Sequence, residues 1–461
     1  MVHILKQAAR WLKKKLSGIV GGPAADKPTG KRPIPSTIPR DEHNISRSNI
    51  SRNAVKVLYR LNGAGYQAHL VGGGVRDLLL GREPKDFDVA TNALPEQVKA
   101  VFNNCRLIGR RFRLAHVHFG QEIIEVATFR SNSETDSDDR QMENGMILSD
   151  NAYGTLEEDA QRRDFTINAL YYNVEDFSVI DFAGGLQDLR NGVIRLLGDP
   201  ESRYREDPVR LLRAVRFAAK LGFVIEPATE APMHRLAPLL QDVPAARLFE
   251  EVLKLFLAGT ALETFEKLRH YDLFGQLFPA TEEALSLEDH QFPITLVNRG
   301  LANTDRRIHE NKPVTPAFLF AVLLWEPVRL RAEDLLSRGT HPYDALQIAA
   351  TEILAEQAER VSIPKRFSYP MREIWQLQPR FLQRNGKRPQ RLMTHPRFRA
   401  AYDFFLLRAE AGEVDQAEAV WWKGFVEKGT QPVATPVAEE KTSKSRRRRR
   451  RRPKTPTATN E

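Results

Sequence analysis

The chain has 461 residues, 41% of them hydrophobic and 8% aromatic, so it can form more than one folded domain and is neither fibrous nor wholly disordered. Its single cysteine, Cys105, excludes an internal disulfide, and the cytoplasm, a reducing compartment, is the simplest setting. Of the net charge of +10, residues 1–40 carry +8 (nine Lys/Arg, one Asp) and residues 439–461 carry +7 (ten Lys/Arg, three Glu). That leaves −5 for residues 41–438, which predicts basic ends that meet a polyanion and a body that uses carboxylates.

Residues 1–45 are predicted to be a basic, flexible N-terminal arm, with a Gly- and Pro-rich linker from residue 21. Apolar residues of the first 20 positions share one helical face among lysines, so peripheral membrane contact is an alternative, although the less favoured one. This segment has no uninterrupted apolar run of the kind found in a secretory signal. The longest apolar run, Ala317–Trp325, is too short to span a bilayer and predicts a buried helix.

Residues 46–190 have the pattern of a small α/β unit. The 131–151 segment within it is too polar for a core and is predicted to be a mobile insertion. The expected elements are a helix over Asn49–Leu61, a strand over Tyr66–Val71, a strand over Phe87–Ala90, a helix capped by Thr91 or Asn92 and ending near Phe102, and a hairpin of Phe112–Phe119 and Glu122–Phe129 that turns at Gly120-Gln121.

Helical periodicity resumes near Leu156, again from Arg205 to Leu221, and from about Pro244 it continues almost everywhere. The predicted fold is therefore α+β, a small mixed-sheet head followed by an all-α remainder. Its parts are the head (46–190), a helical neck that binds nucleotide and RNA (191–260), an all-α body and tail that bind RNA (261–430), and a disordered arginine-rich tail (431–461).

The segment LVGGGVRDLLLGREPKDFDVAT, residues 70–91, predicts a nucleotide site. Gly72 and Gly73 follow a strand, and without a Cβ they let backbone N–H groups approach a phosphate. Asp86 and Asp88 are two apart in a predicted strand, so they face the same side. Their carboxylates repel each other unless a cation lies between them, and Mg²⁺ with triphosphate oxygens is the natural occupant. A solvated Asp-x-Asp is the alternative for the pair alone, and the preceding glycines favour the metal site.

A third carboxylate would complete a two-metal site, and two residues are candidates. Glu125 lies in the apolar strand EIIEVATF, where a charge is costly unless it faces a cleft or a metal; a solvated strand face explains it equally well. Asp164 lies in RRDFTIN, beside an apolar segment (INALYY) predicted as helix. In that cluster Arg163 could bind a triphosphate and Asn168 a ribose hydroxyl, with a surface ion-pair cluster as the alternative.

Further along, Asp207, Arg210, Arg213 and Arg216 recur at three-residue steps and are predicted to form one stripe on a helix. One acid and three arginines provide the donors and acceptors that read a base edge and bind phosphates. An ordinary salt-bridged helix face is the alternative of equal weight.

The blocks GGGVRD, DFD, RRDFTINAL and EDPVRLLRAVRFAAKLGF occur in this order. Over residues of about 46–260 they resemble the class II RNA nucleotidyltransferases, a polymerase-beta-like family of template-independent enzymes with poly(A)-adding and CCA-adding branches. The resemblance implies two Mg²⁺ ions, replaceable by Mn²⁺, on Asp86 and Asp88, with Glu125 or Asp164 as third acid. It also implies nucleotide contacts from Gly73, Arg76 and Arg163, base-edge pairing by Asp207 and Arg210, and triphosphate support by Arg213 and Arg216.

Residues 107–117, LIGRRFRLAHV, resemble the signature of the poly(A)-adding branch, whereas CCA-adding enzymes usually carry a His-Gly-containing strand there. The resemblance therefore implies a polynucleotide adenylyltransferase that transfers AMP from ATP to single-stranded RNA 3′ ends and promotes RNA turnover. Its implied partners are RNA and RNA-degradation proteins, with no DNA. A CCA-adding tRNA enzyme is the first alternative. A non-catalytic RNA-binding protein on the same scaffold is more distant, since the site residues are intact.

Basic residues predict RNA contacts in three places: at Arg110 and Arg111, between residues 365 and 402, and in the C-terminal arginine run. Between residues 365 and 402, Lys and Arg alternate with aromatic residues, which suits phosphate contact and base stacking or, equally, a basic helix over an aromatic core. Seven consecutive arginines from Arg446 predict salt-sensitive RNA affinity. The RNA-binding candidates are Arg110, Arg111, Lys365, Arg366, Arg397, Arg399, Arg446, Arg447, Arg448, Arg449 and Arg450.

Overall fold

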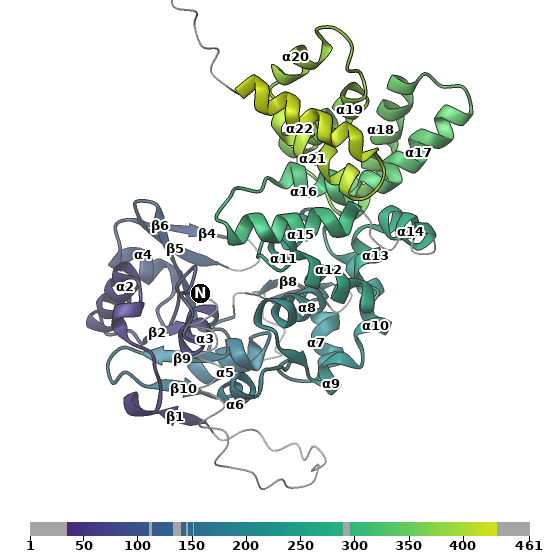
Figure 1. Ribbon diagram of the computed structural model, residues 1–461. Helices are drawn as coiled ribbons and strands as arrows, with labels where there is room; N and C mark the ends of the chain where they lie inside the picture. Colours follow the sequence, from purple (N-terminus) through teal and green to yellow (C-terminus); the bar gives the residue numbers. More distant parts are fainter. Residues whose placement is uncertain are drawn as a thin grey trace, which may run out of the picture.

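Figure 1 shows the computed structural model, which describes residues 35–109, 113–131, 140–143, 146–150, 152–288 and 296–430. A head built around one sheet lies at the left of the view, and the helical remainder extends from it to the upper right. This arrangement confirms the predicted α+β class, with a mixed-sheet head followed by helices.

In the described residues, eight strands form the sheet of the head, in the order β1-β10-β9-β2-β3-β6-β5-β4. β2 (Ala68–Val71) and β3 (Asp88–Thr91) are antiparallel, so the end of β2 and the start of β3 lie at one edge, with Val71 opposite Asp88. β3 also pairs in parallel with β6 (Glu122–Thr128). The other strands are β1 (Ser36–Ile38), β4 (Cys105–Ile108), β5 (Leu114–Phe119), β9 (Leu170–Asn173) and β10 (Val179–Asp181).

The predicted helix after Asn49 and the predicted hairpin are confirmed. The Ser51 side chain accepts hydrogen bonds from the first backbone N–H groups of α2 (Arg52–Gly63), a preferred N-cap arrangement. β5 and β6 pair across a turn at Gly120, whose φ of +65° suits glycine. The other helices of the head are α3 (Gly73–Leu79), α4 (Pro95–Val101), α5 (Leu156–Arg162), α6 (Gly185–Asn191) and the 3₁₀ helices η1 (Arg40–Glu42), η2 (Arg47–Asn49) and η3 (Thr166–Asn168).

Two segments predicted to be irregular contain strands. Ser36–Ile38, expected in the flexible arm, pairs antiparallel with β10 and buries Ile38, so the chain joins the head from β1 onward. Within the expected insertion, β7 (Arg140–Glu143) and β8 (Met146–Asp150) form a two-stranded antiparallel sheet. The remainder of the predicted arm, residues 1–34, lies outside the described residues.

Three local predictions about helices are wrong. Thr91 ends β3 instead of capping a helix, and α4 begins at Pro95, because proline suits a first helical position. INALYY forms a 3₁₀ turn followed by β9. This strand is buried on both faces, so its sequence has no alternation of apolar and polar residues that would distinguish it from a buried helix.

The helix predicted over Arg205–Leu221 is two helices, α7 (Pro200–Glu206) and α8 (Val209–Leu221). Pro208 lacks the N–H that would continue α7, and Asp207 before it is extended.

The helical remainder packs on the head through a continuous apolar core that runs from β2 and β3 through α8 to α19. α8 lies in this core and packs against α11 and α12. A second cluster of buried residues joins α19 to α22. The elements are β11 (Val193–Ile194), β12 (Val224–Ile225), α9 (Pro227–Glu230), α10 (Met233–Leu236), η4 (Ala237–Asp242), α11 (Ala245–Phe256), α12 (Ala261–His270), α13 (Leu273–Leu277), α14 (Pro279–Glu288), α15 (Leu296–His309), α16 (Pro316–Leu323), α17 (Trp325–Ser337), α18 (Pro342–Arg360), α19 (Lys365–Phe381), α20 (Arg388–Met393), α21 (Phe398–Glu410) and α22 (Gln416–Thr430).

The apolar run at 317–325 forms α16 and the start of α17, and its residues are buried, as predicted. Among the described residues, no helix combines the length and the apolar character that crossing a bilayer requires.

Candidate active site

Three acidic residues lie near one another at the end of the sheet where β3 begins. Asp88 is the first residue of β3, and Asp86 precedes it by two positions. Glu125 is the register partner of Asp88 on the parallel strand β6 and therefore shares its face of the sheet. Burial, followed by the charges of Glu125 and Asp86, raises the pKa of Asp88 to about 6, although Arg163 opposes the shift. The ionised carboxylates thus destabilise one another until a cation is bound.

The chemistry of these donors suits Mg²⁺, which prefers carboxylate oxygens and retains other oxygen ligands. Among the described residues, no three His, Cys, Asp or Glu side chains form a complete metal-binding group. Asp86 and Asp88 would therefore share the ion with water and with phosphate oxygens of the substrate, which is the usual arrangement for Mg²⁺ at nucleotide sites.

A pH-dependent effect of Mg²⁺ follows from the raised pKa of Asp88. Because the folded-state pKa of about 6 exceeds the unfolded value of ~3.9, the stability from this group is present at low pH and is lost as pH rises through that window. Mg²⁺ should relieve this destabilisation, so we expect it to raise the melting temperature at about pH 7.5 and to have little effect at about pH 5. Thermal melts with and without Mg²⁺ at both pH values measure this, and equal shifts would contradict the assignment.

The glycine turn between β2 and α3 lies next to two of the predicted arginines. Gly72 has a φ of +72°, a backbone conformation that favours glycine. A Cβ on Gly72 would lie 3.6 Å from Arg163 Nη1, and one on Gly73 would lie 3.6 Å from Arg76 Nη2. The fold therefore brings the predicted Gly72, Gly73, Arg76 and Arg163 together.

Arg163 is fixed in place by two buried partners. Its Nη2 donates to Asp159 Oδ2 (2.9 Å), its Nε donates to the Tyr171 hydroxyl (2.9 Å), and that hydroxyl donates to Asp159 Oδ2 (2.7 Å). Burial disfavours the charge, but Tyr171 and Asp159 outweigh it and raise the pKa of Arg163. Asp159 and Tyr171 were not predicted. The i,i+4 spacing of Asp159 and Arg163 was the local pattern that could have predicted their contact, although two such residues more often form a simple surface pair.

Asp164 and Asn168 join the head to α8. Asp164 Oδ2 accepts from Arg213 Nε (2.7 Å), and its Oδ1 accepts from Asn168 Nδ2 (3.0 Å). Asn168 Oδ1 in turn accepts from Nη1 of Arg76, which is only 2% exposed (2.7 Å). Although burial opposes it, the Arg213 charge and these hydrogen bonds lower the pKa of Asp164. Both oxygens of Asp164 and both ends of the Asn168 amide are thus engaged within the protein.

Three guanidinium groups surround the ring of Phe217 on α8. The guanidinium carbons of Arg76, Arg213 and Arg216 lie 5.1, 5.3 and 4.8 Å from the ring centroid. The Nε of Arg216 is buried and has no hydrogen-bond acceptor among the described residues. Burial and then the charge of Arg213 lower the pKa of Arg216 to about 10. A polyphosphate would relieve this concentration of positive charge.

Asp207 and Arg210 are restrained by residues that the sequence did not reveal as part of the site. Arg210 Nη1 donates to Glu206 Oε2 (2.9 Å), and Arg247 Nη2 on α11 donates to Asp207 Oδ2 (2.7 Å). Arg203 on α7 donates to the backbone oxygens of residues 162 and 163 (2.7 Å each), which fixes α7 against the head. Glu206 lies four positions before Arg210, and that spacing could have predicted their contact. No local pattern links Arg247 to Asp207.

The predicted RNA-binding residues are separated by the structure. Lys365, Arg366, Arg397 and Arg399 are exposed, and the last two pair with Glu373 and Asp403. Three of the six neighbouring rings, Trp375, Phe381 and Tyr402, are buried, as the alternative of a basic helix over an aromatic core predicts, whereas Tyr369 is 59% exposed. Arg110, Arg111 and the arginines from Arg446 to Arg450 lie outside the described residues.

Three family models match the chain in succession. They are the poly A polymerase head domain (residues 68–195), the probable RNA and SrmB-binding site of polymerase A (222–285) and the polymerase A arginine-rich C-terminus (338–455). Poly(A) polymerase I of Salmonella typhi is 55% identical over 401 residues, 86% of each chain, and that of Haemophilus influenzae is 46% identical over 83% of this chain and 86% of its own length. A CCA-adding enzyme of Bacillus subtilis is 38% identical over 52% of this chain and 59% of its own.

Among solved structures, the Thermotoga maritima CCA-adding enzyme complexed with tRNA matches with a TM-score of 0.54 at 22% identity, over 85% of this chain and 86% of that one, which shows the shared fold. Fold and site together define a member of the RNA nucleotidyltransferases that comprise poly(A) polymerases and CCA-adding enzymes. Within that class, the chain belongs to the poly(A) polymerase I family.

Proposed function

We propose that this chain adds AMP from ATP to RNA 3′ ends without a template, with Asp86 and Asp88 as ligands of two Mg²⁺ ions and Glu125 as the third acid. Membership in the poly(A) polymerase I family makes it a polynucleotide adenylyltransferase. The observation that carries the site assignment is the proximity of Asp86 and Glu125 to Asp88, with Arg163 close enough to act on the same carboxylate.

In each round, the RNA 3′-hydroxyl gives up its proton to solvent and attacks the α-phosphate of ATP, one phosphodiester bond forms, and pyrophosphate leaves with the electrons of the broken P–O bond. Bound Mg²⁺ supplies electrostatic stabilisation of the 3′-oxygen and of the leaving group. Arg76, Arg163, Arg213 and Arg216 bind the triphosphate and neutralise the charge that accumulates on it. Because Asp159 and Tyr171 already fix Arg163, little reorganisation is needed when the nucleotide arrives.

Glu125 is the better of the two candidates for the third acid. It shares a sheet face with Asp88, and about half of its side chain is exposed (49%), so a ligand can reach it. His116 Nε2 lies 3.2 Å from one of its oxygens. Asp164, in contrast, is committed to Arg213 and Asn168.

We assign base choice to Asp207 and Arg210. The Asp207 carboxylate would accept a hydrogen bond from the adenine N6 amine, and the Arg210 guanidinium would donate to ring nitrogens. We expect Arg210→Ala to reduce the ratio of kcat/KM for ATP to that for CTP by roughly 10–100-fold, the effect of losing one base-edge contact of ~1–3 kcal/mol. The measurement is single-nucleotide addition with each triphosphate. Arg205→Ala, on the exposed side of α7, is the matched control. An unchanged ratio for Arg210→Ala would refute the assignment.

The exposed Lys365, Arg366, Arg397 and Arg399, together with the arginine-rich C-terminus, are proposed to bind the backbone of single-stranded RNA. The match of residues 222–285 to a probable RNA and SrmB-binding site supports this region, which spans the end of the neck and the start of the body, as a further contact for RNA and for a partner protein. Proteins of RNA degradation are the partners that we propose. We place the activity in the cytoplasm, in RNA turnover; the single, buried cysteine suits that reducing compartment.

The decisive experiment incubates the purified chain with Mg²⁺, an RNA that ends in a 3′-hydroxyl, and each nucleoside triphosphate alone. Long ladders with ATP alone support polyadenylation. Addition that stops after one or two residues, requires CTP and works only on trimmed tRNA would assign the chain to CCA addition. The absence of any addition would favour a non-catalytic RNA-binding protein.

A further inference from the structure

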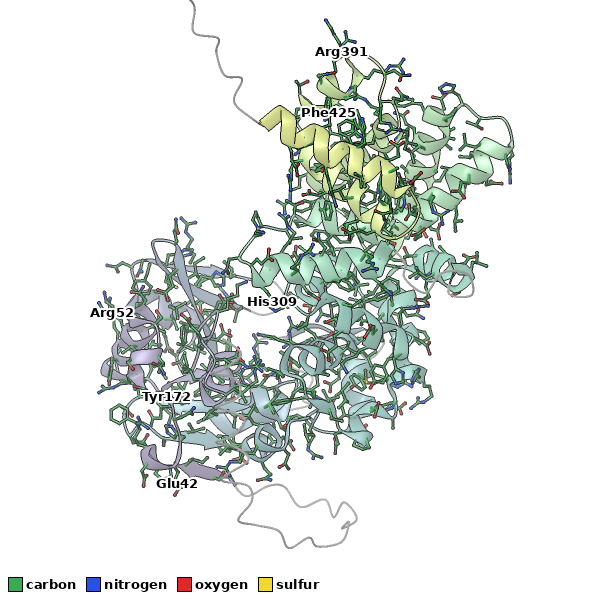
Figure 2. All side chains as sticks on the ribbon, viewed as in Figure 1. Glu42, Arg52, Tyr172, His309, Arg391 and Phe425 are labelled. Carbon is green, nitrogen blue, oxygen red and sulfur yellow. The ribbon has the colours of Figure 1, made fainter. Side chains whose placement is uncertain are left out.

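A concave site lies on the head beside β9, which β2 separates from β3 in the sheet. It has a volume of about 310 Å³, within the range of small-ligand pockets. None of its residues contributes to the candidate active site. Tyr172, one of its lining residues, lies between Arg52 and Glu42 in the view of Figure 2. We call it the edge pocket, and it is lined by Arg40, Ser46, Arg47, Ser48, Tyr172 and Phe177.

Tyr172 supplies a polar group that has no partner. Successive residues of β9 face opposite sides of the sheet, so the Tyr171 hydroxyl binds Asp159 on the active-site side while Tyr172 points to the other. The Tyr172 side chain is fully buried (0% exposed), and its hydroxyl has no hydrogen-bond partner among the residues the structure describes. Buried tyrosine hydroxyls normally have one, so a ligand in the pocket would complete this site.

Two arginines bring positive charge to the same pocket. In the described part of the chain, neither Arg40 nor Arg47 forms an ion pair with a carboxylate: Arg40 Nη1 donates to the His43 backbone oxygen (3.0 Å), and Arg47 Nη1 donates to the Tyr59 hydroxyl (2.8 Å). Both charges act on Tyr172, where they oppose the burial that raises its pKa. The nearby Asp176 carboxylate accepts from the amide and the hydroxyl of Ser178 through its Oδ1.

Phe177 gives the pocket a fixed wall. Its φ is +62°, a left-handed conformation that is uncommon for a bulky residue and persists only where the surroundings impose it. Its backbone oxygen accepts a hydrogen bond from His43 Nε2 (2.8 Å), and its ring lies 4.6 Å from the guanidinium carbon of Arg47. Arg47 is therefore positioned between Phe177 and the Tyr59 hydroxyl, with its remaining N–H groups available.

We propose that the edge pocket binds a phosphate group, with Arg40, Arg47 and the Tyr172 hydroxyl as its donors and the hydroxyls of Ser46 and Ser48 beside them. Guanidinium and hydroxyl groups are the side-chain donors that suit phosphate oxygens. The phosphate belongs either to a compact free ligand, such as pyrophosphate, or to the backbone of RNA. The proposal concerns a site separate from the catalytic one and does not depend on the proposed reaction.

The test is calorimetric titration of the full chain with inorganic pyrophosphate without Mg²⁺, in wild type and in Arg40→Gln/Arg47→Gln. The active-site arginines also bind pyrophosphate, so we expect two sites per wild-type chain and the loss of one, or its weakening by at least ~10-fold, in the double variant. Tyr172→Phe should weaken the same site several-fold and leave the other unchanged. Arg52→Gln, an exposed residue of the adjacent α2, is the matched control.

A parallel titration with single-stranded oligoadenylate separates the two sources of phosphate. If wild type and the double variant bind pyrophosphate alike, at a single site, but the double variant loses affinity for the oligonucleotide, the edge pocket binds RNA backbone. If neither pyrophosphate stoichiometry nor oligonucleotide affinity changes while the melting temperature stays at the wild-type value, the proposal is overturned. ATP-dependent addition to a short primer should be retained in the double variant, because neither arginine belongs to the active site.

Discussion

Asp88→Asn should reduce the rate of nucleotide addition by ~10³-fold or more, because an amide supplies a much weaker metal ligand and several kcal/mol of transition-state stabilisation depend on the metals. The fold should survive. The ionised carboxylate of Asp88 is partly buried near Glu125 and Asp86, so replacing it removes a repulsion, and the melting temperature without Mg²⁺ should stay the same or rise at neutral pH. Single-turnover primer extension and thermal melts measure the two effects.

The matched control is Asp242→Asn, an exposed aspartate of η4, which should extend primers at the wild-type rate. The Mg²⁺-dependent rise in melting temperature should also disappear in Asp88→Asn and persist in the control. An Asp88→Asn protein that still extends primers within tenfold of the wild-type rate would remove Asp88 from the metal site. A variant that is inactive but also unfolded would instead show that Asp88 has a structural role.

The second large effect separates Glu125 from Asp164. Asp164→Ala should lower the free energy of unfolding by about 1–3 kcal/mol, because it leaves the half-buried guanidinium of Arg213 without its partner. Glu125→Gln should leave the free energy of unfolding nearly unchanged and reduce kcat by roughly 10²–10³-fold, the range found when one group that stabilises the transition state is lost. Denaturant unfolding and primer extension on both variants measure the contrast.

Asp164→Asn provides the control for this pair, since it keeps an oxygen acceptor for Arg213 and should lose less stability than Asp164→Ala. If Asp164→Asn unfolds like the wild type and is inactive, and Glu125→Gln is active, then Asp164 is the third acid. If Glu125→Gln is active and Asp164→Asn is active too, the site uses two carboxylates only.

Residues close together in the chain were the ones that the sequence could place. Asp86 and Asp88 are two positions apart, and the glycines that precede them follow a buried strand, so their common location could be predicted. The parallel register that brings Glu125 beside Asp88 depends on how β6 is placed against β3, which no local pattern encodes. The same is true of Arg247, whose contact with Asp207 spans 40 positions.

The wrong predictions also have physical reasons. The break between α7 and α8 was readable from Pro208, but the three-residue spacing of the charged residues suggested one continuous helix. β9 is buried on both faces, so its sequence lacks the alternation that identifies a half-exposed strand. β1 is a short strand that exists only because β10, about 140 positions later, pairs with it.

The ion pair between Asp164 and Arg213 has a consequence for how accurately the incoming nucleotide is selected. In the proposed site, Arg210 contacts the base, and Arg213 and Arg216 contact the phosphates. The three arginines lie on successive turns of the single helix α8. A base that displaces Arg210 also displaces the two phosphate-binding arginines, and the ion pair transmits that movement to the head that bears the carboxylates. A wrong nucleotide would then place its α-phosphate out of line with the RNA 3′-hydroxyl. Discrimination between nucleotides should therefore lower the rate of the chemical step as well as the affinity of binding.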